Sequence, residues 1–221
     1  HENVYRPSAE SHTFQEISQM GLEMLGAVDE TAVEQAVCLA AQSLEQLGRP
    51  WVLEVSHMGY LFGLFDALSV PETARPGLLA ALRAKNIHEL RAAAAAAGLE
   101  SAGADALTAL LELSGDYAAV LPKAEALCRN ARMREAAAEL RTLAAPLAQA
   151  GGTARLDLTL AGEMEYYNGL VFQGYLRSLP RPLLKGGRYD LLMQKFTPGA
   201  GAIGFAVYLD ELGRLSAPLP P

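Results

Sequence analysis

Cysteine is scarce in this chain of 221 residues, which contains only Cys38 and Cys128. The two lie far apart in segments with helical patterns, whereas metal sites and redox motifs place their cysteines a few residues from one another. This spacing argues against a metal site or a redox motif built on cysteine. We expect two buried free thiols in a cytoplasmic protein.

Long apolar runs and an excess of positive charge are also missing. No run of about 18 apolar residues occurs, and the chain begins His1-Glu2-Asn3 without the basic and apolar regions of a signal peptide. The 18 Lys and Arg residues against 25 Asp and Glu give a net charge of −7, whereas a nucleic-acid-binding protein must neutralise phosphates. We therefore expect no membrane span, no secretory precursor and no main role on nucleic acid.

The composition that remains is that of a globular protein, with 51% hydrophobic and 19% charged residues. Hydrophobic spacing predicts an amphipathic helix over 29–48 and a short buried strand over 51–55. Residues 72–150 have the pattern of successive Ala- and Leu-rich helices. We divide the chain into a first core segment 1–70, a helical insertion or set of covering helices 71–150, and a second core segment 151–221.

The last third of the chain has the alternation of β-strands. Apolar and polar residues alternate with a period of two up to Leu160, which is typical of a half-buried strand. We expect residues 167–176 to form its antiparallel partner and residues 203–208 to form a further strand. Strands at both ends of the chain with helices between them indicate an α+β fold.

The segment 14–25 fits both a helix and a strand, and its periodicity does not decide between them. On the strand interpretation, Gln19, Gly21 and Glu23 share one face. The two polar side chains would then lie about 13 Å apart, and the glycine between them would leave room for a small polar ligand. The alternative is a strand face that points to solvent.

Four segments in order along the chain resemble motifs of the class II histidyl-tRNA synthetases. They are Val4–Pro7 with Phe14–Gly26 (the second class II motif), Glu163–Phe172 (the histidine-binding peptide), Gly186–Asp190 (a second histidine-specific segment) and Ala202–Leu212 (the third class II motif). The resemblance implies an α+β fold like the class II aminoacyl-tRNA synthetase catalytic core. This core is an antiparallel sheet flanked by helices, here with a helical insertion.

Two departures from these motifs remove positive charge. The arginine that precedes the double tyrosine in the synthetases is Gly162 here, and the arginine that holds ATP phosphate in the third motif is Glu211. Losing one such group typically costs about 3 kcal/mol of transition-state stabilisation, so amino-acid activation is not expected. With these losses, and with no anticodon-binding segment after the third motif, the chain resembles the regulatory subunits of ATP phosphoribosyltransferase, which are synthetase paralogues.

This second resemblance implies a non-catalytic subunit that binds L-histidine as its effector. Its partner would be the short-form catalytic subunit of ATP phosphoribosyltransferase, which catalyses the first step of histidine biosynthesis, and it would self-associate as a dimer. The family also implies a further N-terminal portion of roughly a hundred residues. No metal or cofactor is expected, since His12, His57 and His88 have no partners at metal-ligand spacing.

The resemblance also implies a set of histidine-binding residues. Gln19 would face the amino group and Glu23 the imidazole, with tyrosines as an aromatic wall and glycines that allow close backbone approach. For Arg6, a role as carboxylate ligand and a structural ion pair both remain open. The full set is Arg6, Gln19, Glu23, Tyr166, Tyr167, Gly186, Gly187 and Tyr189.

Two alternatives belong to other classes of protein. One is a partial histidyl-tRNA synthetase catalytic core that still forms histidyl-adenylate, against which Gly162 and Glu211 argue. The other is a free-standing histidine-binding class II paralogue that acts as an interaction module. Gene neighbourhood beside histidine-biosynthesis genes would separate this alternative from a regulatory subunit.

Overall fold

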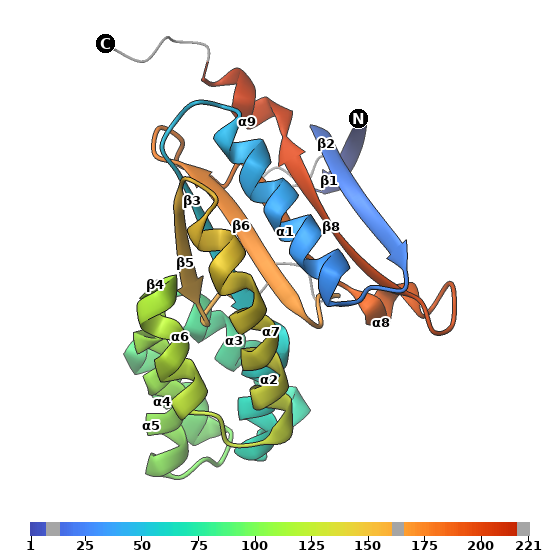
Figure 1. Cartoon of the computed structure of the whole chain (residues 1–221). Helices are drawn as coiled ribbons and strands as arrows, with labels where there is room; N and C mark the ends of the chain where they lie inside the picture. The colour runs from blue at the N-terminus through green and yellow to red at the C-terminus, as the bar shows by residue number, and fades with distance from the viewer. Residues whose placement is uncertain (8–13, 161–165, 216–221) are drawn as a thin grey trace.

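The computed structural model describes residues 1–7, 14–160 and 166–215, and its centre is one eight-stranded sheet (Figure 1). The strand order is β1-β2-β8-β7-β6-β3-β5-β4, and every neighbouring pair is antiparallel except β3 and β5. The strands are β1 (Glu2–Pro7), β2 (Phe14–Gly26), β3 (Trp51–His57), β4 (Ser114–Asp116), β5 (Thr153–Asp157), β6 (Leu170–Leu176), β7 (Leu184–Arg188) and β8 (Gly201–Tyr208).

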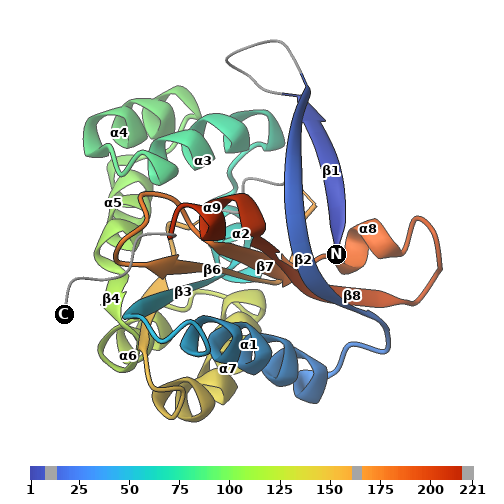
Figure 2. The same ribbon diagram turned by 90° about the horizontal axis from the view of Figure 1, so that it is seen from above.

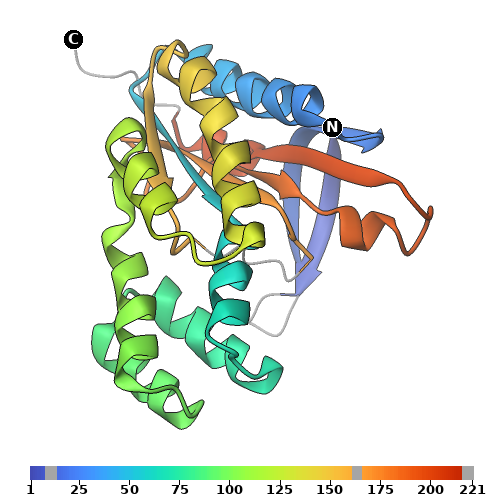
Figure 3. The ribbon, with the colours of Figure 1, turned by 60° about the horizontal axis from the view of Figure 1, so that its bottom comes forward.

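Two long helices, α1 and α7, lie on the same face of this sheet (Figure 2). The other helices gather mainly beyond one end of the sheet, as Figures 1 and 3 show. The α-helices are α1 (Glu30–Glu45), α2 (Met58–Ala67), α3 (Arg75–Arg83), α4 (Ile87–Ala96), α5 (Ser101–Ala109), α6 (Tyr117–Ala126), α7 (Ala131–Ala148), α8 (Asp190–Met193) and α9 (Leu209–Gly213), with short 3-10 turns at Glu72–Ala74 and Leu110–Glu112.

Helix α1 confirms the helix predicted for residues 29–48. Asp29 is its N-cap, because the Asp29 side chain accepts a hydrogen bond from the backbone N–H of Ala32 at 2.9 Å. Val33, Val37 and Leu44 recur at helical spacing and are almost completely buried against the sheet. Amphipathic spacing and a polar cap therefore give this helix both its start and its buried face.

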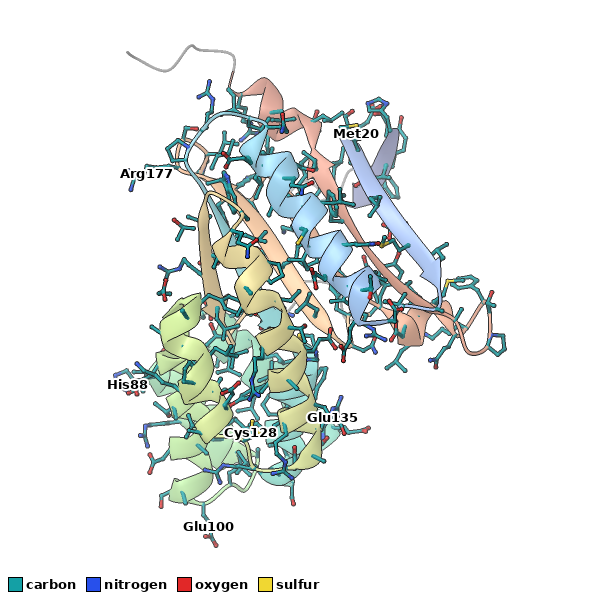
Figure 4. All side chains as sticks on the ribbon, viewed as in Figure 1. Met20, His88, Glu100, Cys128, Glu135 and Arg177 are labelled. Carbon is teal, nitrogen blue, oxygen red and sulfur yellow. The ribbon has the colours of Figure 1, made fainter. Side chains whose placement is uncertain are left out.

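Strand β2 settles the ambiguous segment as a strand of 13 residues. It pairs with β1 on one side and β8 on the other, so backbone hydrogen bonds on both sides favour the extended form. Alternation then places Leu22 and Met24 against the core, whereas Met20, on the same face in the middle of the strand, is 51% exposed (Figure 4). Gln19 and Glu23 point to the opposite face.

The pairing predicted for the last third was wrong. Strand β5 pairs in parallel with β3, and β6 pairs with β3 and β7 instead of with β5. Parallel strands need a long crossover connection, and the helices from α2 to α7 provide it between β3 and β5. A period-two pattern reports that a segment is a strand and says nothing about such a distant partner. The residues 161–165 predicted as the connection lie outside the described residues.

The segment between β3 and β5 is helical as predicted, apart from the short strand β4. Both cysteines are free thiols, and each is only partly buried, Cys38 on α1 and Cys128 after α6 (Figure 4). His88 is exposed on α4, His57 is buried at the end of β3, and His12 is outside the described residues. Among the helices of the described ranges, none has the length and apolar character needed to cross a membrane.

Candidate functional site

A cavity of about 140 Å³ opens on the sheet face opposite α1, above strands β2, β8, β7 and β6. Gly174 of β6 abuts Leu44 of α1, so the alternating neighbour Gln173 points into the cavity on the other face. The described residues that line the cavity are Gln19, Glu23, Tyr166, Tyr167, Val171, Phe172, Gln173, Lys185, Gly186, Gly204, Phe205, Ala206 and Tyr208.

Glycines on the central strands make room for the side chains of this cavity. Gly204 lies opposite Glu23 in the β2–β8 register, and a Cβ at Gly204 would collide with the Glu23 carboxylate. A Cβ at Gly187 would lie 2.7 Å from the ring of Tyr167, closer than real Cβ contacts come. The absence of a Cβ at these two glycines therefore allows the carboxylate and the phenol ring to lie close to the sheet backbone.

The Glu23 carboxylate accepts a hydrogen bond from the Tyr189 hydroxyl. Partial burial raises the pKa of Glu23, and the hydrogen bond from Tyr189 opposes that rise. Burial also raises the pKa of Tyr189, with the neighbouring carboxylate as a further cause, so the phenol stays protonated and remains a donor. The carboxylate is thereby held in one orientation with a second oxygen available to a ligand.

Three tyrosine rings form a wall beside this carboxylate. The ring centroids of Tyr166 and Tyr167 are 4.8 Å apart, and those of Tyr166 and Tyr189 are 5.6 Å apart. Tyr167 and Tyr189 meet edge to face at 6.3 Å. These separations are those of attractive aromatic contacts, so the three rings form a packed cluster, and two of its members, Tyr166 and Tyr167, line the cavity.

Gln19 supplies a polar group that lacks a partner. Its Oε1 atom is buried and accepts no hydrogen bond from any of the described residues. A buried carbonyl oxygen without a donor costs free energy, about 1 to 3 kcal/mol. Since Gln19 lines the cavity, a ligand that brings an N–H group to this oxygen would remove that cost.

The structure brings most of the predicted site residues together. Gln19, Glu23, Tyr166, Tyr167 and Gly186 line the cavity. Gly187 and Tyr189 contact lining residues, the first through the ring of Tyr167 and the second through the carboxylate of Glu23. Arg6 lies in β1 opposite Gln15, and its side chain is outside the described residues, as is Gly162.

Sequence reasoning missed three polar lining residues, Gln173, Lys185 and Tyr208. Gln173 pairs with Lys185 across β6 and β7, and Tyr208 pairs with Gln19 across β8 and β2. Antiparallel partners point to the same face, so the strand register alone brings them to the cavity. Alternation within β6 and β7 does not place Gln173 and Lys185 on a common face unless the register between the two strands is known.

The position that matches the phosphate-binding arginine of the third motif is also defined. Glu211 lies on the short helix α9 just beyond β8, is 8% exposed, and has its Oε2 atom 3.3 Å from Nη1 of Arg214. The described cavity lining provides a carboxylate, an ammonium group, side-chain amides and phenol hydroxyls, which can hold a small polar molecule by hydrogen bonds and charge. The arrangement suits reversible binding of a small polar molecule.

A partly buried ionic network anchors the segment that carries Tyr189. The Arg188 guanidinium donates to Asp190 at 2.7 Å and to the backbone carbonyl of Val28 at 3.1 Å, and it lies 3.8 Å from Glu139 of α7. Glu139 also lies 3.5 Å from Nε2 of His57. Burial raises the pKa of Glu139, and the contacts with His57 and Arg188 outweigh it and lower the pKa overall. The network joins the cavity wall to helix α7.

No metal centre emerges from the described part of the chain, where no three His, Cys, Asp or Glu side chains are grouped to hold an ion. The carboxylates of Asp157, Glu139 and Asp190 instead form ion pairs with lysine or arginine side chains.

Comparisons with known proteins agree with this geometry. A family model described as histidyl-tRNA synthetase matches residues 2–212. An ATP phosphoribosyltransferase regulatory subunit from Shouchella clausii is 36% identical over 202 residues, which are 90% of this chain and 51% of that protein. The chain thus spans about half the length of the curated relatives it matches.

Solved structures give the same fold. The crystal structure of an ATP phosphoribosyltransferase regulatory subunit/histidyl-tRNA synthetase from Bacillus halodurans has a TM-score of 0.84 at 32% identity, covering 98% of this chain and 57% of that one. An ATP phosphoribosyl transferase complex from Thermotoga maritima has a TM-score of 0.72 at 21% identity, covering 94% and 71%. These likenesses confirm the α+β fold class expected from the four motifs.

Proposed function

Because the chain belongs to the histidyl-tRNA synthetase family, we propose that it acts as the regulatory subunit of an ATP phosphoribosyltransferase. The observation that carries this proposal is a cavity lined by Gln19, Glu23 and tyrosines, in a chain where the position matching the phosphate-binding arginine of the synthetase motif is an acid, Glu211. The names of the relatives, which are ATP phosphoribosyltransferase regulatory subunits, support the same assignment.

The effector in this proposal is L-histidine. The Glu23 carboxylate, oriented by Tyr189, accepts a hydrogen bond from an imidazole N–H. The orphan Oε1 of Gln19 accepts one from the α-ammonium group, and the ring of Tyr167 packs on the imidazole. Arg6, Tyr166, Gly186 and Gly187 complete the proposed site.

The proposed subunit does not catalyse amino-acid activation. Adenylate formation needs positive charge at the reacting phosphate, and each lost donor costs about 10² to 10³ in rate. Glu211 places a carboxylate where the synthetase motif has an arginine, and Gly162 lacks a charge altogether. Histidine binding without chemistry is the activity that these residues support.

Regulation then works by coupling between subunits. We propose that the protein forms dimers that associate with the short-form catalytic subunit, and that histidine favours the less active state of the complex. Coupling free energies of this kind are typically about 1 to 3 kcal/mol. In the cell this would give feedback control of the first step of histidine biosynthesis.

Reconstitution tests the proposal. The full-length protein is mixed with a short-form catalytic subunit, and phosphoribosyl transfer is measured with and without L-histidine. We expect a stable complex on size-exclusion chromatography, increased activity, and inhibition by histidine that a Gln19→Ala, Glu23→Ala variant abolishes. Failure to form a complex contradicts the partner, and histidine-dependent pyrophosphate exchange well above background contradicts the non-catalytic role.

A further inference from the structure

Lys185 is a cavity residue that none of the recognised motifs contains. It lies in β7 directly before Gly186, and its partners in the adjacent strands are Gln173 of β6 and Ala206 of β8. All three line the cavity. Because paired residues of antiparallel strands share a face, the Lys185 side chain rises from the cavity floor beside Gln173.

The cavity has opposite charges at its two ends. Within the described lining, Glu23 is the acidic residue and Lys185 the basic one. The register runs from Lys185 through Ala206 to Gly21, and Glu23 lies two residues further along β2, so the backbone positions of the two charged residues are about 12 Å apart. A ligand that carries a carboxylate at one end and a hydrogen-bond donor at the other complements this arrangement.

Gln173 adds a second donor next to the lysine. It is 6% exposed, and its Oε1 atom accepts a hydrogen bond from the Tyr175 hydroxyl at 2.7 Å. With its oxygen engaged, the amide presents its N–H groups as the remaining polar function. An ammonium and an amide N–H from neighbouring strands are a suitable pair of donors for one carboxylate.

The size of the cavity limits the ligand to a small molecule. Pockets for drug-sized ligands have volumes of about 300 to 1,000 Å³, whereas this cavity has about 140 Å³. A single amino acid matches it better than a nucleotide does.

We propose that Lys185 and Gln173 bind the α-carboxylate of the effector L-histidine, and this inference rests on the proposed function. The imidazole then lies at Glu23 and the α-ammonium at Gln19. The site consequently selects the free amino acid over analogues whose carboxylate is replaced.

Calorimetric titration of the full-length protein with L-histidine and L-histidinol tests this assignment. L-histidinol keeps the imidazole and the ammonium and has a hydroxymethyl group in place of the carboxylate. In Lys185→Met we expect affinity for L-histidine to fall about 10- to 100-fold, the effect of one charge-assisted hydrogen bond, and affinity for L-histidinol to stay within about twofold of wild type. Lys185→Arg keeps the charge and retains preference for histidine.

Two further variants guard against an effect on folding. Gln173→Glu still accepts the hydrogen bond from Tyr175, and its new carboxylate repels that of histidine, so preference shifts toward L-histidinol. Lys195→Met removes an exposed lysine after α8 and leaves both affinities unchanged.

The outcomes separate the inference from the proposed function. If Lys185→Met loses affinity for L-histidine and L-histidinol equally, or loses affinity for neither, the carboxylate assignment is overturned while histidine binding by the wild type stands. Unchanged affinity for both ligands would transfer the role to another cation such as Arg6. A wild-type protein that binds no histidine overturns the effector itself, and the inference with it.

Discussion

At the scale of single residues, Glu23 shows how the cavity gains its chemistry. Its carboxylate is oriented by Tyr189, which lies 166 positions further along the chain. We predict that Glu23→Gln weakens histidine binding about 10- to 100-fold, since a hydrogen bond to a charged group contributes about 1.5 to 3 kcal/mol. The amide oxygen still accepts from Tyr189, so the fold is retained. Titration calorimetry measures the effect.

The pH dependence of this effect has a definite sign. Partial burial raises the pKa of Glu23, so the carboxylate takes up a proton at a higher pH than an ordinary glutamate does. The advantage of wild type over Glu23→Gln is full above that pKa and is lost as the pH falls through it. Glu16→Gln, on the opposite face of β2, is the matched control. A wild-type advantage that does not change with pH would contradict this role.

At the scale of elements, one ion pair fastens the helical segment to the sheet. Lys85, which follows α3, donates to Asp157 of β5 at 2.6 Å, and Asp157 also accepts from Ser114 and Thr159. Burial alone would raise the pKa of Asp157, but the hydrogen bonds from Lys85 and Thr159 outweigh it and lower the pKa. We predict that Lys85→Met lowers the free energy of unfolding by about 1 to 3 kcal/mol, less than for a fully buried pair because the lysine is half exposed.

Denaturant unfolding at several pH values checks this prediction. Because the pKa of Asp157 is lowered in the folded state, the stabilisation is present at neutral pH and disappears as the pH falls through the folded-state pKa. Lys85 has a φ of 50°, a left-handed conformation that methionine shares at similar cost, so the substitution isolates the ion pair. Lys123→Met, on the exposed side of α6, should leave stability unchanged. Equal losses of unfolding free energy in Lys85→Met and Lys123→Met would contradict a specific contribution of the Lys85–Asp157 ion pair.

At the scale of the whole molecule, strands from both ends of the chain build the cavity, whereas the helices between β3 and β5 lie mostly beyond it. We propose on this basis that 1–70 and 151–221 form one core and 71–150 an insertion.

If histidine regulates a complex, linkage requires that histidine and the catalytic-subunit substrates change each other's affinity by the same factor, typically about 5- to 150-fold. Calorimetric titrations of histidine with and without ATP, and of ATP with and without histidine, measure both factors in the assembled complex. Unequal factors would rule out coupling within a single complex.

The sequence by itself determined the local elements and the chemical character of the site. Helix α1 followed from its cap and apolar spacing, and Gln19, Glu23 and the tyrosines followed from motif resemblance, because both signals are written in nearby residues. Only the tertiary structure decided that β5 joins β3 in parallel and that Lys185 and Gln173 stand beside each other in the cavity. Strand partners are chosen by burial and backbone hydrogen bonding between distant segments, and no local period records that choice.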